Sequence, residues 1–227
     1  MTTTPARRDP RERRREAAPE VTTVHMTRVP RSSVVTYRDD GVLARGMGLL
    51  VAGQLPPLPP AIAGAFVTGV MLLLGVAGAD GPAVFAPAVA LMLAGPGSSH
   101  PHDGRLDWLV PPILRITEYV FIASVGFAWD VPRFLVLALL GAVLFHHYDV
   151  VYRCRQHVYP PTWLASAGLG WEGRMLIIAM GALLGIVTAV FVLAALYLSA
   201  LFCWESVTCW LAAPRSGVEA ADLGAQD

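Results

Sequence analysis

The sequence predicts an all-α membrane protein, a helix bundle of about six transmembrane helices preceded by a helix at the membrane interface. Hydrophobic residues make up 55% of the 227 positions, and the mean hydropathy is +0.53. Only 15% of the residues are charged, whereas an ordinary soluble domain has about 25%. The apolar residues also gather in long runs, as transmembrane helices require. A water-soluble fold is therefore disfavoured.

The apolar runs give the helices in order. We expect the first four at about 61–78, 82–94, 108–129 and 132–151. The last run, 175–211, would be roughly 55 Å long as one helix, almost twice the hydrocarbon thickness of a bilayer. Gly181, Gly185 and the β-branched residues that follow them predict a reversal near 185–188. This run therefore supplies a short fifth helix and a sixth.

The remaining segments flank this bundle. Residues 1–36 form an Arg-rich arm without an apolar face, which we expect to be disordered. Residues 41–53 carry a broad apolar surface and predict a short helix lying at the interface, stopped by the prolines that follow. The membrane domain is expected to span 37–212, and a disordered tail to span 213–227.

Arginine placement predicts the orientation. All 17 basic residues are arginines, and short cytoplasmic loops carry an excess of basic residues. Six spans with both termini in the cytoplasm would leave only Arg115 and Arg133 away from that side. The lysine-free composition fits a high-GC bacterial genome. We therefore expect a multi-pass protein of the bacterial plasma membrane.

The densest polar loop, 95–108, precedes the third predicted helix and contains Asp103, Arg105 and Asp107. Two carboxylates four residues apart at a helix start face the same way and can share a divalent cation, here expected to be Mg²⁺. Asp107 could equally cap the helix without binding a metal. Both interpretations are open.

Two charged residues, Arg115 and Glu118, lie at membrane depth in the third predicted helix. Charged groups there are costly and usually face a polar cavity or one another. Their spacing of three residues lets them pair. A functional cavity and a buried structural ion pair are the two alternatives.

The end of the fourth predicted helix is the strongest candidate for chemistry. His146, Asp149 and Arg153 share one face by their spacing, with His147 beside it and Arg155 two residues further on. An imidazole held by a carboxylate near arginines suits acid/base chemistry or phosphate binding. A belt of interfacial residues with snorkelling arginines is the alternative. We favour the functional interpretation.

Further polar residues, Trp171, Glu172, Arg174 and Glu205, are predicted at the same depth. Carboxylates for a metal and arginines for phosphate would suit an anionic, phosphate-containing substrate. We expect every predicted site residue to have one of three roles. Catalysis is assigned to Asp107, Glu118, His147 and Asp149; substrate binding to Arg105, Arg115, Arg153, Arg155, Trp171, Glu172, Arg174 and Glu205; and Mg²⁺ binding to Asp103, Asp107 and Asp149.

About a quarter of the chain resembles the CDP-alcohol phosphatidyltransferases. The stretches RLD at 105–107 and ITEY at 116–119 are similar to one helix of that family, and HYD at 147–149 with YR at 152–153 to its next helix. Those six-helix enzymes move a phosphatidyl-type group from a CDP-linked donor to an alcohol, with metals held by aspartates. The resemblance implies the same fold and a metal-dependent transfer.

The match departs from the family pattern at important positions. If Asp107 is the third family aspartate, Pro111 occupies the place of the fourth. If Asp103 and Asp107 are instead the third and fourth, Ser99 replaces the family glycine. Either alignment leaves the metal site altered.

The first half of the family motif has a counterpart only far upstream. The stretch DGVLAR at 40–45 reproduces part of it, but Tyr37 stands where the first aspartate belongs. It also lies more than 60 residues before Asp103, where about 18 are expected, so we interpret this match as coincidence. The whole chain, through its YRDDG, SSHPHDGRLDW, HHYDVVYR and GWEGR stretches, more closely resembles an actinobacterial membrane domain often attached to these transferases. That resemblance implies a divergent relative with an altered or lost active site.

Two hypotheses follow. The first is a membrane enzyme, a Mg²⁺-dependent transferase or lyase/cyclase, acting at the cytoplasmic face on a phosphate- or diphosphate-bearing lipid-like substrate of CDP-alcohol or prenyl diphosphate type. The second is a non-catalytic partner or scaffold of a lipid-synthesis transferase. Expected partners are the lipid bilayer and the substrate, and the sequence carries no nucleic-acid motif.

Overall fold

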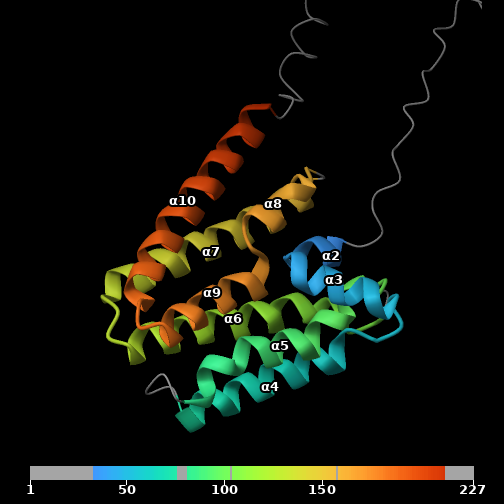
Figure 1. Cartoon of the computed structure of the whole chain (residues 1–227). Coiled ribbons are helices and arrows are strands. Elements are labelled where there is room, and N and C mark those ends of the chain that lie inside the picture. Colours follow the sequence, from blue (N-terminus) through green and yellow to red (C-terminus); the bar gives the residue numbers. More distant parts are fainter. Residues whose placement is uncertain (1–32, 76–80, 103, 157, 213–227) are drawn as a thin grey trace, which may run out of the picture. The chain divides into compact units, whose positions relative to one another are not determined.

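A computed structural model describes residues 33–75, 81–102, 104–156 and 158–212 (Figure 1). All regular structure in these ranges is helical, and no strand occurs among them. The predicted all-α class is therefore confirmed. In chain order, the α-helices and the 3₁₀ helices (η) are α2 (Ser33–Tyr37), α3 (Val42–Val51), α4 (Leu58–Gly75), η1 (Pro82–Phe85), α5 (Ala86–Ala94), η2 (Gly95–Ser99), η3 (Asp107–Leu109), α6 (Val110–Ala128), α7 (Arg133–Arg155), α8 (Thr162–Ala167), α9 (Gly170–Leu183) and α10 (Val187–Ala212).

Five of the described helical segments are long and apolar enough to cross a membrane. They are Leu58–Gly75, Pro82–Ser99, Asp107–Ala128, Arg133–Arg155 and Val187–Leu211. The predicted fifth helix corresponds to α9, whose 14 residues rise about 21 Å, less than the roughly 30 Å of a bilayer core. The prediction of a membrane helix bundle is confirmed for five of its six spans.

The surface of the bundle supports the same conclusion. Large apolar side chains point outward along the long helices: Leu73 is 89% exposed, Leu74 75%, Phe134 69% and Leu193 67%. A soluble protein rarely exposes apolar side chains over so wide an area. Several charged side chains are instead buried, among them Arg38, Arg153 and Arg174.

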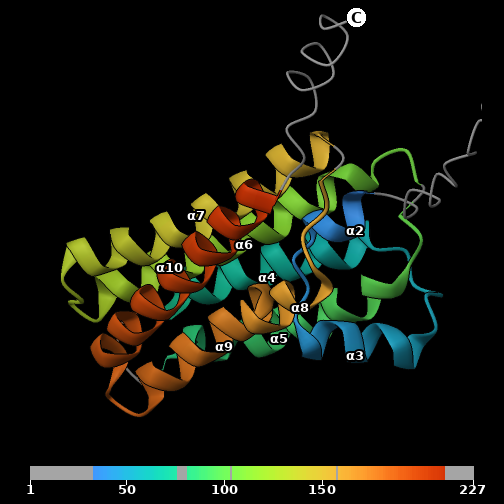
Figure 2. The same ribbon diagram turned by 90° about the horizontal axis from the view of Figure 1, so that it is seen from above.

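The long elements pack as three pairs stacked in layers. Helix α4 packs with α5, α6 with α9, and α7 with α10. The α6–α9 pair forms the middle layer, because α4 and α5 contact it on one side and α7 and α10 on the other (Figure 1). The short helices α2, α3 and α8 gather at one end of this bundle (Figure 2).

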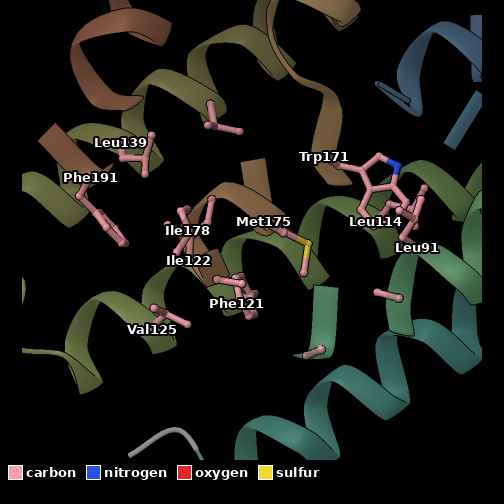
Figure 3. Close-up of a cluster of buried hydrophobic side chains, with 14 of the residues drawn as sticks. Leu91, Leu114, Phe121, Ile122, Val125, Leu139, Trp171, Met175, Ile178 and Phe191 are labelled. Carbon is pink, nitrogen blue, oxygen red and sulfur yellow. The ribbon is translucent and has the colours of Figure 1, made fainter. Parts of the chain in front are cut away.

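Buried apolar side chains of the middle layer form the core. Phe121, Ile122 and Val125 of α6 and Ile178 of α9 are 0–1% exposed and meet Phe191 of α10 (Figure 3). Fixing these two helices against each other also fixes the charged residues that they carry at the end near α3.

The predicted reversal near 185–188 is confirmed. Helix α9 ends at Leu183, and Gly185 adopts φ +70, a left-handed conformation that favours glycine. Ile186 donates its backbone N–H to Gly181 at 2.9 Å, and Gly185 donates to Ala182 at 3.2 Å. This pair of bonds is the Schellman ending of a helix, which lets α10 turn back along α9.

The boundaries of the N-terminal segments differ partly from the prediction. The helix expected within 41–53 is confirmed as α3. The arm expected to be disordered over 1–36 is wrong at its end, because 33–36 belong to α2. Residues 1–32 and the predicted tail 213–227 lie outside the described residues.

Candidate functional site

The centre of the polar end is the segment Arg38-Asp39-Asp40 between α2 and α3. These three residues are 1%, 6% and 7% exposed. Asp39 has φ 53, in the left-handed region that aspartate enters more readily than most residues. The turn gives the two neighbouring carboxylates different sets of partners.

Asp39 accepts hydrogen bonds from two elements of the bundle. Arg174 of α9 donates from Nη2 to Oδ2 at 2.7 Å. His147 and His146 of α7 lie with Nε2 3.2 Å from Oδ2 and 3.4 Å from Oδ1. Burial would raise the pKa of Asp39, but the Arg174 charge and the two histidines outweigh it and hold that pKa well below its usual value. Asp39 is therefore an ionised, buried carboxylate.

Arg174 connects Asp39 to α6. Its Nε and Nη2 donate to the two carboxylate oxygens of Glu118 at 2.5 and 3.1 Å, and Nη1 donates to the Gly168 carbonyl at 2.9 Å. An ion pair between Arg115 and Glu118, one of the two alternatives for these residues, is not among the ion pairs of the described chain. Arg115 instead donates to the Tyr37 carbonyl at 2.9 Å, because the face of α6 that carries Glu118 packs against α9.

Asp40 is held by a second arginine. Arg38 donates from Nε to Oδ2 at 2.6 Å, and the Trp171 indole donates to Oδ1 at 2.8 Å. Arg38 also donates to the Ala94 carbonyl and to Nε2 of His102, both at 3.2 Å. Burial, and then the Arg38 charge, lower the pKa of His102. These bonds fasten the segment to the end of α5 and the start of α9.

Glu172 caps α3. Its carboxylate accepts the backbone N–H groups of Gly41 and Ala44 at 3.0 and 3.1 Å, which would otherwise be unsatisfied at the helix start. The approach needs glycine, since a Cβ on Gly41 would lie 2.5 Å from Oε1 of Glu172. Gly170 of α9 has φ +61, and a Cβ on it would lie 2.1 Å from the backbone nitrogen of Gly41. Glu172 thus has a well-defined structural task.

A separate ionic cluster ties α7 to α10. Arg153 binds both carboxylate oxygens of Glu205 at 2.8 Å and Asp149 at 2.7 Å. Trp210 donates to Asp149 at 3.3 Å. The three residues predicted to share one face therefore belong to two clusters: His146 bonds to Asp39, whereas Asp149 and Arg153 bond to each other.

A cavity of about 220 Å³ opens beside the Arg38–Asp40 segment. Its polar lining consists of Thr36, Asp39, Asp40, Arg45, Ser98, His146 and Thr162. Its apolar wall includes Val35, Val150, Pro160, Pro161 and Leu164. Such a mixture of an apolar wall and a few polar groups is typical of ligand sites.

Arg45 is the cationic group of this cavity. Its Nε donates to the Asp40 carbonyl at 2.8 Å, and neither terminal nitrogen bonds to a residue that the structure describes. Ser98 donates its hydroxyl to the Ala44 carbonyl at 2.8 Å. The half-buried guanidinium of Arg45 is thus oriented from one side while its other edge stays available.

Of the residues assigned to the site from sequence, none that the structure describes lines this cavity. His147, Trp171, Glu172 and Arg174 instead bond to the Arg38–Asp40 segment or to α3, and Glu118 bonds to Arg174. The sequence reasoning placed His146 on the candidate face of the fourth predicted helix without assigning it a role, and it missed Asp39, Asp40 and Arg45 as site residues. Two signals were present: the adjacent aspartates, and the arginine that interrupts the apolar surface of 41–53.

The predicted Mg²⁺ site stays a prediction. Asp107 accepts the Gly104 backbone N–H at 3.0 Å, and Asp103 lies outside the described residues. Within the described part of the chain, no group of three or more His, Cys, Asp or Glu side chains could hold a metal ion. Arg105 and Arg155 are exposed, and the substrate-binding roles assigned to them also stay predictions.

Residues 30–225 match DUF5941, described as a family of unknown function. The chain belongs to this family. The match to DUF5941 includes the Arg38–Asp40 segment and every described helix. The chain matches no curated protein and no solved structure. The likeness to CDP-alcohol phosphatidyltransferases therefore stays a resemblance of short motifs.

Proposed function

We propose that this DUF5941 protein is a membrane enzyme acting on a phosphate- or diphosphate-bearing lipid-like substrate, of CDP-alcohol or prenyl diphosphate type. One observation carries the proposal. The cavity brings together an arginine edge, a carboxylate-held imidazole and an apolar wall. An amphiphilic phosphate ester presents the matching groups.

Charge compensation favours an anion in this cavity despite its two aspartates. Arg38 is paired with Asp40, and Arg174 is paired with Asp39 and shared with Glu118. Arg45 has no ion pair with a described carboxylate, so its charge is available to a ligand. Guanidinium groups bind phosphate oxygens in a bidentate manner. We therefore assign phosphate binding to Arg45.

The surroundings of the cavity favour a lipid-like substrate. Exposed aromatic side chains occur around this end of the bundle, among them Tyr148 of α7, Trp163 of α8 and Trp204 of α10. Aromatic residues of this kind favour the headgroup level of a bilayer. Helix α3 exposes Leu49 and Leu50 by 75% and 87%, which supports its role as an interfacial helix. A headgroup would then reach the cavity from the membrane surface.

The proposed orientation has both termini in the cytoplasm of a bacterial cell, and it rests on arginine placement alone. Mg²⁺ bound by Asp103, Asp107 and Asp149 remains part of the proposal. Asp107 and Asp149 each bind protein groups at the ends of different helices, so no chemical step is assigned to the metal. Metal dependence is instead a variable of the assay.

The test is turnover by the full chain purified in detergent. Substrates are a CDP-diacylglycerol and a prenyl diphosphate, each offered with glycerol and inositol as acceptors, with Mg²⁺ and with EDTA. Arg45→Gln should raise the KM of the phosphate substrate at least tenfold. Arg133→Gln, an exposed arginine at the opposite end of α7, is the matched control and should leave KM unchanged. Equal effects of the two variants would contradict phosphate binding by Arg45.

A non-catalytic role as partner of a lipid-synthesis transferase is the second candidate. The observation in its favour is that the buried carboxylates of Asp39, Asp40, Glu118 and Glu172 all have protein partners. A purely structural network would need nothing more. Absence of turnover with every substrate, together with co-purification of a CDP-dependent transferase, would favour this role.

A further inference from the structure

We propose that His146, oriented by Asp39, is the general base that takes the proton from a hydroxyl acceptor in the cavity. The proposal rests on the proposed function and adds a second substrate to it. It also assigns His147, its neighbour in sequence, to positioning alone.

The two oxygens of Asp39 are used differently. Oδ2 is engaged by Arg174 and His147, at 2.7 and 3.2 Å. Oδ1 is engaged, among the described residues, only by Nε2 of His146 at 3.4 Å. A carboxylate can only accept, so His146 carries its proton on Nε2. Its lone pair is then on Nδ1.

The two histidines differ in the nitrogen that remains available. The His147 ring is engaged at both nitrogens, because Tyr119 lies with its hydroxyl 2.5 Å from Nδ1 and Asp39 binds Nε2. Nδ1 of His146 bonds to no residue in the described part of the chain. His146 also lines the cavity, and His147 does not.

Packing holds the His146 ring in place. Its plane stacks on Phe202 of α10, with ring centroids 4.0 Å apart and an interplanar angle of 10°. Both residues are almost fully buried, at 3% and 1% exposed. Positioning by a carboxylate on one nitrogen and an aromatic face leaves the second nitrogen as the reactive atom, the arrangement that a general base needs.

The step that follows is a transfer to an alcohol. Nδ1 of His146 takes the hydroxyl proton while the alcohol oxygen forms a bond to phosphorus. The bond from phosphorus to the leaving oxygen breaks, and the leaving phosphate takes that electron pair. His146 returns its proton to the leaving group or to water, so the step is balanced without a redox partner. Asp39 stabilises the imidazolium that exists in between.

This inference separates the two substrate types of the proposed function. Transfer between a phosphate donor and an alcohol requires a base near the acceptor hydroxyl. Ionisation of a prenyl diphosphate for cyclisation does not begin with proton removal from an alcohol. His146 therefore favours a phosphoryl-type transfer to a hydroxyl-bearing acceptor.

The first test needs no turnover. Diethyl pyrocarbonate acylates imidazole nitrogens that carry an available lone pair, and tandem mass spectrometry distinguishes His146 from His147. We expect His146 of the detergent-purified full chain to react at least ten times faster than His147, and to be slowed by CDP-glycerol. Equal or faster reaction of His147 would overturn the assignment whether or not turnover is seen.

The second test is kinetic. His146→Gln should lower kcat for transfer to the alcohol about 100-fold or more, with the KM of the phosphate donor changed less than about threefold. His147→Gln, the adjacent comparison, should keep the fast labelling of His146. Transfer by His146→Gln within about threefold of wild type would refute the base. If wild type consumes a phosphate substrate without transfer to an alcohol, the base role fails and the proposed function stands. If wild type turns over no substrate, both fail, whereas a failure of labelling alone leaves phosphate binding by Arg45 standing.

Discussion

Removing the charge of Arg174 should strongly destabilise the protein. The side chain is 2% exposed and donates to Glu118, Asp39 and Gly168. Replacing it in Arg174→Gln leaves two buried carboxylates without their cation. Breaking a buried ion pair on one side costs about 3–5 kcal/mol. In a chain of this size that corresponds to a fall in Tm of roughly 6–20 °C.

The assay is thermal unfolding of the purified protein in one detergent at one scan rate, followed by a double-mutant cycle with Glu118→Gln. Neutralising Glu118 removes one of the two uncompensated charges, so the double variant should be more stable than the sum of the single effects by about 1–3 kcal/mol. Arg155→Gln, an exposed arginine, should change stability by less than about 0.5 kcal/mol. Simple additivity, or a loss in Arg174→Gln no larger than in the control, would refute the reasoning.

Three further outcomes are expected. The folded-state pKa of Asp39 is depressed, so the stability that its carboxylate contributes should be fully present above about pH 4 and be lost as the pH falls through the folded pKa. The difference in unfolding free energy between wild type and Asp39→Asn should therefore shrink only in that acid range, and a difference that grows there would contradict the depressed pKa. Gly41→Ala should destabilise by about 1–3 kcal/mol, because the added carbon meets the Glu172 carboxylate, and unfolding that matches wild type would rule out this contact. Glu205→Gln should lower Tm by several degrees through the loss of its charged pair with Arg153. The KM of the phosphate donor should stay unchanged, because the Arg153 cluster does not line the cavity; a changed KM would show that this cluster is coupled to the Asp39 cluster.

Most of the fold was predictable from the lengths of the apolar runs in the sequence and from the glycines near the reversal after α9. Long apolar runs fix a membrane helix to within a few residues, because the bilayer sets the length and every backbone group must bond within the helix. The reversal after α9 was also readable, since Gly185 supplies the left-handed residue that such an ending needs. The short helix α2 was missed because its five residues lie next to a strongly charged stretch and have no helical periodicity of their own.

The site was predictable only in part, since its contacts join distant segments. The buried charges of Glu118 and Arg174 were recognised from their predicted depth, but local spacing suggested Arg115 as the partner of Glu118. Helix packing decided otherwise. Asp39 and Asp40 resemble ordinary acidic residues before a helix. No local pattern shows that the Arg38–Asp40 segment will be buried against α5, α7 and α9. Tertiary contacts of this range leave no periodic signal.

The Asp39–Arg174 bond also constrains how the protein is assembled. The two residues are 135 positions apart, and α6 carries Glu118 into the bundle before α9 has been synthesised. Until Arg174 arrives, the carboxyl at position 118 has no cation from α9, and an ionised group at that depth is costly. The Asp39–Arg174 bond can therefore form only after α9 has been synthesised. A chain that ended before α9 would contain Asp39, His146 and His147 but not the arginine that binds Asp39 and Glu118.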